Sequence, residues 1–481
     1  MLRRTFLAST LAAPLVGTAR KRPNILYIMA DDHASHAISA YGSTINRTPH
    51  IDRLARDGSR LDNCFCTNSI CTPSRAVILT GQYSHVTGVK TLNDPLDPAR
   101  QNVAKLLRDG GYSTGMIGKW HLHKDPSGFD YWNILPGQGA YYDPVFIEMG
   151  EKKKHTGYCT DLIGDFSLDW LKRWDASKKR DNPFFLMCHH KAPHRPWQPG
   201  PKYASMLRDV KVDEPNSLYD DYADRAAAAR LATMRVGEHM TKTDVKVDLP
   251  PNLKGNDLRR WAYQLYIKDY LRCIQSVDDN VGKLLNWLSS TGHEEDTVVI
   301  YTSDQGFFLG DHGWFDKRFM YEESLRMPFL IRYPREIKPS VNHDITLNLD
   351  FAETFLDYAR LKVPADMQGR SFRQNLHGKA PADWRKSMYY RYWMHLADHG
   401  VAAHYGVRTE RYKLIYYYGK ALGSSGAINQ DRPPEWELFD LLKDPREMRN
   451  VYADPSYAMV VSDMKKELSR LQQNYGDTPC E

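Results

Sequence analysis

Residues 71–81 read Cys-Thr-Pro-Ser-Arg-Ala-Val-Ile-Leu-Thr-Gly, and this stretch decides how the rest of the chain is interpreted. Its first residues fit the beginning of a helix, and Gly81 fits the end of one. A cysteine just before a helix N-terminus has a lowered pKa and can act as a nucleophile. A buried cysteine beside a turn is the alternative, and the stretch by itself leaves both interpretations open.

Short apolar runs on either side of this stretch predict buried parallel strands. They lie at 24–29, 113–118, 184–188 and 297–302, and helical stretches separate them. The clearest helix spans about 261–288, where apolar residues recur at helical spacing. This alternation predicts an α/β sandwich with a mostly parallel central sheet.

The pattern changes near residue 370, where short strands separated by turns replace the earlier alternation. The stretches that predict four strands and a closing helix are 388–393, 406–409, 413–418, 436–439 and about 457–473. We therefore expect a catalytic domain over residues 20–370 and a smaller C-terminal α+β subdomain with an antiparallel sheet over residues 371–481.

The first residues of the chain fit a targeting segment. Arg3 and Arg4 form a twin-arginine pattern, a short apolar stretch follows at 11–16, and small residues precede residue 20. A membrane anchor is the alternative, but a bilayer needs about 20 apolar residues, and no segment reaches that length. We predict a twin-arginine-type signal peptide over residues 1–19, no stable membrane insertion, and a periplasmic or secreted bacterial protein.

Composition narrows the class of partner. The formal net charge is +6, and the predicted signal peptide contributes two of these charges. That balance is too mild for nucleic-acid binding, and no basic stripe is present, although a positive bias would help attract an anionic substrate. The seven cysteines have neither the spacing of a disulfide scaffold nor that of a zinc site.

Polar residues follow two of the predicted strands at their carboxyl ends. Asp31 and Asp32 follow the first strand, and Asp304 and Gln305 follow the strand at 297–302. Ligands bind at this edge of an open parallel sheet, and such oxygen donors suit calcium or magnesium rather than zinc. Helix capping or turn formation is the alternative for either cluster alone, but two clusters at two strand ends favour a metal.

The segment Cys71-Thr72-Pro73-Ser74-Arg75, followed by Leu79-Thr80-Gly81, resembles the signature of type I sulfatases in the alkaline phosphatase superfamily. In that family this cysteine is oxidised to formylglycine before or during folding. Other segments resemble family motifs at 118–121, 192–194, 302–306, 315–317 and 436–445. The resemblance runs from about residue 22 to the end. It departs at Gln305, where many members have Asn or His, but Gln also offers an oxygen.

The resemblance implies a calcium ion and a set of catalytic residues. Asp31, Asp32, Asp304, Gln305 and the oxygen of residue 71 would hold the ion. The residues that would carry the reaction are Cys71, Arg75, Lys119, His121, His194 and Lys317. A formylglycine-generating enzyme would be a partner during maturation.

The implied reaction uses the hydrated aldehyde at residue 71. One hydroxyl attacks sulfur, and loss of the second hydroxyl's proton later restores the aldehyde. Arg75 and Lys119 would stabilise charge, and His121 would take that proton. His194 and Lys317 would contact the bridging oxygen, with His194 as the acid for the leaving alcohol.

The substrate is less well defined. Segments 129–133, 189–191 and 303–328 resemble bacterial exo-sulfatases of glycosaminoglycans and other sulfated polysaccharides, with N-acetylglucosamine-6-sulfatases as the nearest match. Imidazoles can bind sugar hydroxyls, and a guanidinium can pair with a uronate or a second sulfate. The candidate sugar-binding residues are His123, His312, His399, His404 and Arg408. Ordinary structural polar residues are the alternative for these five.

Three other functions stay open from the sequence. The substrate could be another marine or gut polysaccharide or an aryl sulfate. A phosphatase or phosphonate hydrolase can share the fold, although a two-zinc phosphatase needs more His and Asp ligands than this chain offers. A non-catalytic protein that binds sulfated glycans is the third, and the complete set of catalytic residues argues against it.

Overall fold

The computed structural model describes residues 21–480, so the predicted signal peptide lies outside the described residues. The strands of its large sheet are β1 (Asn24–Ala30), β2 (Ser59–Leu61), β4 (Ser113–Lys119), β5 (Tyr131–Leu135), β6 (Val145–Glu148), β7 (Glu151–Lys154), β8 (Phe184–His189), β9 (Thr297–Ser303), β12 (Phe329–Arg332) and β13 (Ser340–Asn342). They are ordered β13-β2-β12-β9-β1-β8-β4-β5-β6-β7.

The middle of this sheet is parallel, as the sequence predicts. β1 pairs in parallel with β9 on one side and β8 on the other, and β8, β4 and β5 continue the parallel run. Every residue of β1, β4, β8 and β9 is buried. Such strands need cover on both faces, which explains their continuous apolar sequences.

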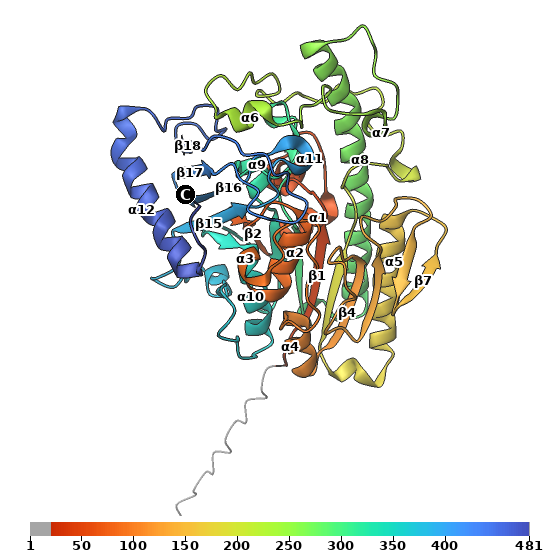
Figure 1. Ribbon diagram of the computed structural model, residues 1–481. Coiled ribbons are helices and arrows are strands. Elements are labelled where there is room, and N and C mark those ends of the chain that lie inside the picture. Colours follow the sequence, from red (N-terminus) through yellow and green to blue (C-terminus); the bar gives the residue numbers. More distant parts are fainter. Residues whose placement is uncertain (1–20, 481) are drawn as a thin grey trace, which may run out of the picture.

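Helices cover both faces. The larger ones are α1 (Pro49–Arg56), α2 (Cys71–Thr80), α4 (Val103–Asp109), α5 (Cys159–Asp175), α8 (Gly255–Ser290) and α10 (Phe351–Tyr358). Tyr27 and Phe185 stack against Phe355 of α10, whereas Gly115, on the other face, contacts Trp170 of α5. In Figure 1, α5 and α8 accordingly lie to the right of the central strands, and α2 and α10 lie to the left.

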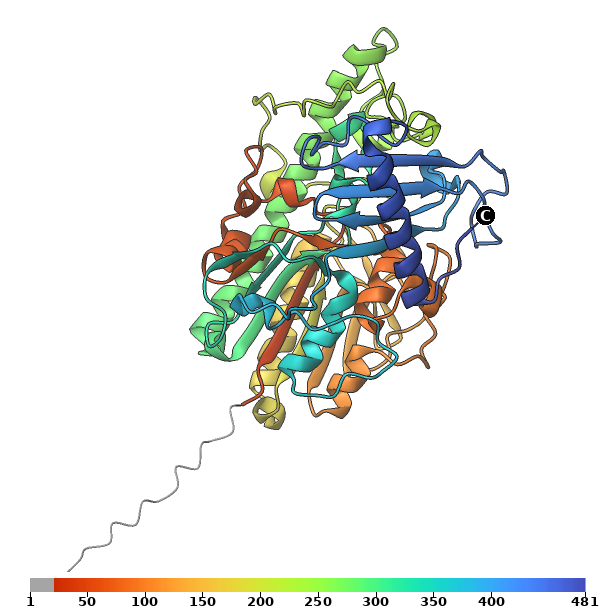
Figure 2. The same cartoon turned by 90° about the vertical axis from the view of Figure 1, so that its left-hand side faces the viewer.

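A second, smaller sheet follows. Its strands are β15 (Ser387–Tyr392), β16 (His404–Thr409), β17 (Tyr412–Tyr417) and β18 (Glu435–Asp440). They pair in this order and all antiparallel. Helix α12 (Ala458–Tyr475) crosses the sheet, as Figure 2 shows. The predicted small sheet and closing helix are confirmed, whereas the domain boundary at residue 370 stays a prediction.

The edges of the large sheet are where the structure adds to the sequence analysis. β5, β6 and β7 extend one edge, and β12, β2 and β13 form the other. All four residues of β7 are exposed, so the strand lacks the alternation that reveals a half-buried strand. α8 begins at Gly255 rather than near residue 261. The sequence analysis missed its first turns because they are mainly polar and lack the apolar spacing of a helix.

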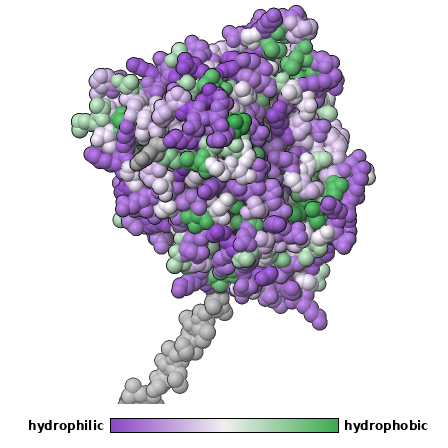
Figure 3. Space-filling view, viewed as in Figure 1, coloured by the Kyte–Doolittle hydropathy of each residue, from purple (hydrophilic) through white to green (hydrophobic). Residues whose placement is uncertain are grey.

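The surface is mainly polar. On the face shown in Figure 3, hydrophobic residues gather only in small, scattered groups. Within residues 21–480, no helix combines the length and the apolar character that crossing a bilayer requires.

Candidate active site

Cys71 is the first residue of α2 and lies in the wall of a pocket of about 270 Å³. The residue is fully buried. Burial raises the pKa of the Cys71 thiol, although Lys119 and Lys317 pull it in the other direction. The lowered pKa expected for a cysteine at a helix N-terminus is therefore wrong here, and an unmodified Cys71 is a poor nucleophile.

The predicted metal ligands meet because β1 and β9 run side by side. Ala30 is in register with Ser303, so the residues that follow both strands lie together. The backbone N–H of Asp32 donates to Asp304 Oδ1 at 3.2 Å. Oxygens of Asp31 and Asp32 lie within 4.8 Å of one another and of a ring nitrogen of His194.

Two oxygens at this site fit a bound cation. Oδ1 of Asp31 and Oε1 of Gln305 are buried and accept no hydrogen bond within the described part of the chain. Buried oxygens without a donor are costly, and a divalent cation would satisfy them. The donor set consists of carboxylates and an amide and thus fits calcium or magnesium.

Three cations surround these carboxylates. Lys119 forms an ion pair with Asp31. Lys317 Nζ donates to both carboxylate oxygens of Asp32, at 2.6 and 2.7 Å. The guanidinium of Arg75 donates through Nε to Asp304 Oδ2 at 3.0 Å. Positive charge is thus fixed beside the pocket, where a sulfate ester would need it.

The cations affect the carboxylates unequally. Burial raises the pKa of Asp31, but the attraction of Lys119 and Arg75 outweighs it and holds this pKa well below its usual range. For Asp32, burial outweighs the attraction of Lys317 and raises the pKa to about 7. A divalent cation between the two would favour the ionised form of both.

His121 is neutral and well placed to accept a proton. Burial, reinforced by the charges of Lys119 and Arg75, lowers its pKa to about 2. The Thr72 hydroxyl donates to the His121 carbonyl oxygen at 3.0 Å, which ties this residue to α2 beside Cys71. Thr72 thus holds His121 beside α2, but a pKa this low makes its imidazole a weak base, and the proton-accepting role stays a prediction.

His194 lies beside the same carboxylates but is also neutral. Its Nδ1 contacts the carbonyl oxygen of Arg195 at 2.6 Å and so carries the proton, and its Nε2 lies 3.7 Å from Asp32 Oδ2. Burial and the charge of Lys119 hold its pKa well below the usual range. Lys317 is the protonated group here, because Asp32 raises its pKa despite burial. This arrangement disfavours the predicted role of His194 as the acid.

The pocket also contains residues that the sequence analysis missed. They are Gln138, Arg195, Asp316, Arg318 and Asp398. Arg195 and Arg318 directly follow predicted catalytic residues, so their positions in the chain offered a signal. Gln138 offered none, because it lies in a turn after β5 and reaches the site only through the fold, where it accepts a hydrogen bond from Lys119.

Two of the five predicted sugar-binding residues lie at or near the pocket. His399 lines it, with Nε2 3.1 Å from Asp316 Oδ2 and Nδ1 3.0 Å from the Thr233 carbonyl oxygen. His123 lies close by, with Nε2 2.7 Å from the carbonyl oxygen of Leu92, another lining residue. Both remain candidates for contact with a substrate.

The other three candidates are held by protein partners away from the pocket. His312 lies between Asp220 and Glu323. Arg408 donates to both carboxylate oxygens of Glu322, and His404 packs among aromatic rings. His404 and Arg408 share the buried face of β16. We therefore remove His312, His404 and Arg408 from the sugar-binding set.

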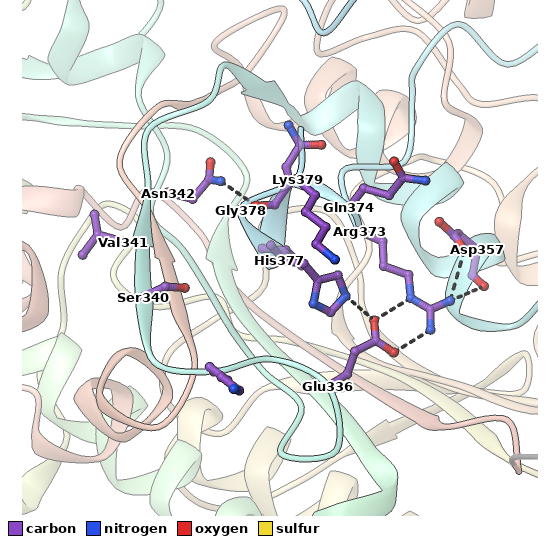
Figure 4. Close-up of a pocket in the computed structure, with 13 residues that line it drawn as sticks. Glu336, Ser340, Val341, Asn342, Asp357, Arg373, Gln374, His377, Gly378 and Lys379 are labelled. Atoms are coloured by element: carbon purple, nitrogen blue, oxygen red, sulfur yellow. Dashed lines mark hydrogen bonds and ion pairs between the residues drawn. The ribbon is translucent and has the colours of Figure 1, made fainter. Parts of the chain in front are cut away.

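A larger cavity, of about 1100 Å³, lies near the β13 edge of the large sheet. Figure 4 shows Arg373 between Glu336 and Asp357, with His377 also on Glu336. This cavity contains none of the predicted catalytic or metal-binding residues. The smaller pocket at Cys71 is therefore the candidate active site.

Comparison with known proteins identifies the family. The sequence model named Sulfatase matches residues 23–361, and that of the N-sulphoglucosamine sulphohydrolase C-terminal region matches residues 310–474. The chain belongs to the sulfatase family. It is thus a sulfuric ester hydrolase, as the motif at residues 71–81 predicts, with the alkaline phosphatase-like fold expected for it.

Similar proteins cover nearly all of this sulfatase. An N-acetylglucosamine-6-O-sulfatase of Bacteroides thetaiotaomicron is 42% identical, over 95% of this chain and 87% of that one. An arylsulfatase of Clostridium perfringens is 25% identical, over 95% of this chain and 96% of that one. The solved structure of BT4656 in complex with its substrate D-glucosamine-2-N,6-O-disulfate has a TM-score of 0.89 at 41% identity, covering 95% of this chain and 98% of that one.

Proposed function

We propose that this sulfatase removes the 6-sulfate from an N-acetylglucosamine, or a related glucosamine, of a sulfated glycan. The observation that carries the proposal is the 42% identity to an N-acetylglucosamine-6-O-sulfatase over 95% of the chain. The pocket of about 270 Å³ lies at the small end of the range for ligand pockets. It therefore favours one terminal sugar and exo action.

We infer that residue 71 is formylglycine in the mature enzyme, installed by a formylglycine-generating enzyme. The oxygen of residue 71, Asp31, Asp32, Asp304 and Gln305 would hold a calcium ion, and the unpartnered oxygens of Asp31 and Gln305 support this assignment. In place, the hydrated aldehyde supplies a nucleophilic hydroxyl, and the ion supplies charge for a sulfate oxygen.

The chain's own residues then have defined tasks. Arg75 and Lys119 fix Asp304 and Asp31 and keep positive charge beside residue 71. His121, which Thr72 ties to α2 beside residue 71, would accept a proton from that residue. Lys317 carries a proton at the pocket wall, where it can donate to the bridging oxygen as the alcohol leaves.

We further infer export to the periplasm or beyond. The support is the twin-arginine pattern at Arg3 and Arg4 within residues 1–19. Twin-arginine export carries folded proteins, which suits an active site completed in the cytoplasm.

Sulfate release from defined sugars tests the substrate assignment. N-acetylglucosamine-6-sulfate should be hydrolysed with a kcat/KM at least about a hundredfold above that of N-acetylgalactosamine-6-sulfate, because a site built to bind one hydroxyl rejects its epimer. The 3-sulfate of N-acetylglucosamine and an aryl sulfate complete the panel. Equal or higher activity on any of these three would overturn the assignment.

Two measurements test the inferred chemistry at residue 71. Mass spectrometry of active enzyme should show the aldehyde or its hydrate, and active enzyme with only cysteine would exclude it. Stripping the metal should abolish turnover, and calcium should restore it. Recovery with zinc but not calcium would contradict the oxygen-donor site.

A further inference from the structure

A groove of about 540 Å³, which we call the cationic groove, is lined by residues that closely follow those of the catalytic pocket along the chain. Four basic residues line it, together with one acidic residue and one tyrosine: Arg208, Lys246, Lys268, Arg272, Asp269 and Tyr142. Lys268, Asp269 and Arg272 lie within about one turn of α8.

Positive charge exceeds negative charge in this groove. Asp269 pairs with Arg272 at 2.8 Å and with Lys246 at 3.3 Å. Arg208, which is exposed, and Lys268, which is half-buried, have no acidic side chain within ion-pair distance in residues 21–480. Lys268 Nζ donates one hydrogen bond, to the carbonyl oxygen of Arg208 at 3.3 Å, and keeps two further N–H donors. These two cations are available to an anionic ligand.

The groove also offers an aromatic surface. Tyr142 is 43% exposed, although its hydroxyl donates to the carbonyl oxygen of Pro199. That hydrogen bond fixes the ring at the groove. A fixed aromatic ring beside unpaired Lys and Arg side chains suits a sugar that bears anionic groups, because the ring packs on the sugar and the cations bind the charges.

Two segments connect the groove to the catalytic pocket. His194 and Arg195 line the pocket, and three residues further on, Gln198 lines the groove. The Cα atoms of Arg195 and Gln198 are therefore at most about 11 Å apart. Arg195 Nη2 also donates a hydrogen bond to Asp244 Oδ2 at 2.7 Å. Asp244 directly precedes the groove residues Val245 and Lys246.

We propose that the cationic groove is a second saccharide subsite. It binds a sulfate- or carboxylate-bearing sugar of the same glycan whose terminal residue occupies the catalytic pocket. This inference rests on the proposed function, since it requires a sulfated glycan as the substrate. It assigns recognition of the longer chain to Arg208, Lys268 and Tyr142.

The test compares two substrates and two double variants. Arg208→Ala/Lys268→Ala should raise KM about tenfold for a sulfated tetrasaccharide that ends in N-acetylglucosamine-6-sulfate, as expected for about 1.4 kcal/mol. KM for the monosaccharide should stay unchanged. The control is Lys338→Ala/Lys379→Ala, which removes equal charge from the cavity in Figure 4. Equal KM values in all three proteins, or an equal rise in the control, would overturn the subsite.

Binding without turnover separates this inference from the proposed function. Calorimetry would measure the affinity of the sulfated tetrasaccharide for Cys71→Ala enzyme, with and without Arg208→Ala/Lys268→Ala. If neither substrate is hydrolysed by wild type but affinity still falls about tenfold, the proposed function fails and the subsite stands. If hydrolysis proceeds and affinity is unchanged, the subsite fails alone.

Discussion

Two of the buried charge clusters of this sulfatase differ in their surroundings, because only one of them lies at the catalytic pocket. Beside the catalytic pocket, Asp31 Oδ1 and Gln305 Oε1 accept no hydrogen bond within residues 21–480, and Asp31 Oδ1 has only a 3.8 Å ion pair with Arg75. The second region, which we call the inter-sheet cluster, consists of Glu322, Arg326, Arg408, Lys413 and Glu447.

In the inter-sheet cluster, opposite charges form close ion pairs, although Lys413 Nζ and Glu447 Oε1 make no hydrogen bond within residues 21–480. Arg408 binds Glu322 at 2.9 Å, and Lys413 lies 2.6 Å from Glu447. Lys413 and Glu447 are fully buried. The difference teaches that burial and charge alone do not define a functional site; unmatched polar atoms beside a cavity do.

Cys71→Ala, in the catalytic pocket, should cause the largest loss of activity. Without a nucleophile at residue 71, kcat/KM for N-acetylglucosamine-6-sulfate should fall at least about ten-thousandfold. The melting temperature should change little, since the removed atom lies in a pocket wall. Cys66→Ala, at another buried cysteine five positions earlier that does not line the pocket, is the matched control and should remain active. Comparable inactivation of both variants would mean that packing, not chemistry, was lost.

Arg408→Met, in the inter-sheet cluster, should lower stability and leave activity nearly unchanged. The substitution removes two hydrogen bonds to the buried Glu322, which keeps its ion pairs with Arg326 and Lys413. The free energy of unfolding should therefore drop by about 2–3 kcal/mol. At a temperature where the variant is folded, kcat/KM should stay within about twofold of wild type. Denaturant titration and steady-state kinetics measure the two quantities. A large loss of activity with unchanged stability would return Arg408 to the sugar-binding residues.

His404→Phe should have the smallest effect of the three variants. It should change how the free energy of unfolding depends on pH. Burial lowers the pKa of His404 from 6.5 to about 4, so the imidazole is neutral at pH 7 whether the chain is folded or unfolded. As pH falls below 6.5, the unfolded chain gains a proton that the folded chain excludes until about pH 4. Wild type should therefore lose about 2 kcal/mol through this group between about pH 7.5 and pH 5.

His404→Phe should lack this contribution, and phenylalanine suits the surrounding rings of Phe319, Tyr390 and Tyr417. Melting curves of both proteins at the two pH values measure the difference. Identical pH dependence would show that the ring is not desolvated as described. Reduced activity on a glycan but not on an aryl sulfate would restore His404 as a specificity residue.

The sequence predicted the buried central strands and the motifs that directly follow them. The apolar runs revealed β1, β4, β8 and β9, and the acidic pairs after β1 and β9 met because parallel neighbours end at the same edge. Residues brought in from distant turns could not be predicted this way. Gln138 reaches Lys119 only because β5 lies beside β4.

Strand β16 shows a second limit. Its alternation places His404 and Arg408 on one face, but the sequence does not say what that face meets. The structure turns it toward Phe319 and Glu322 instead of the catalytic pocket. The other face, with Tyr405, contacts Cys480 rather than the catalytic pocket. A period-2 pattern therefore predicts a strand and its two faces, but not what each face meets.

Strand β7 ends the large sheet with four exposed residues, Glu151 and three lysines. One side of its backbone pairs with β6, and the other side lies at the sheet's edge. An open strand edge is a template onto which another chain can add and begin to aggregate. The three adjacent lysines repel a second copy of the same strand. A strand without any apolar alternation therefore helps to keep neighbouring molecules of this enzyme apart in concentrated solution.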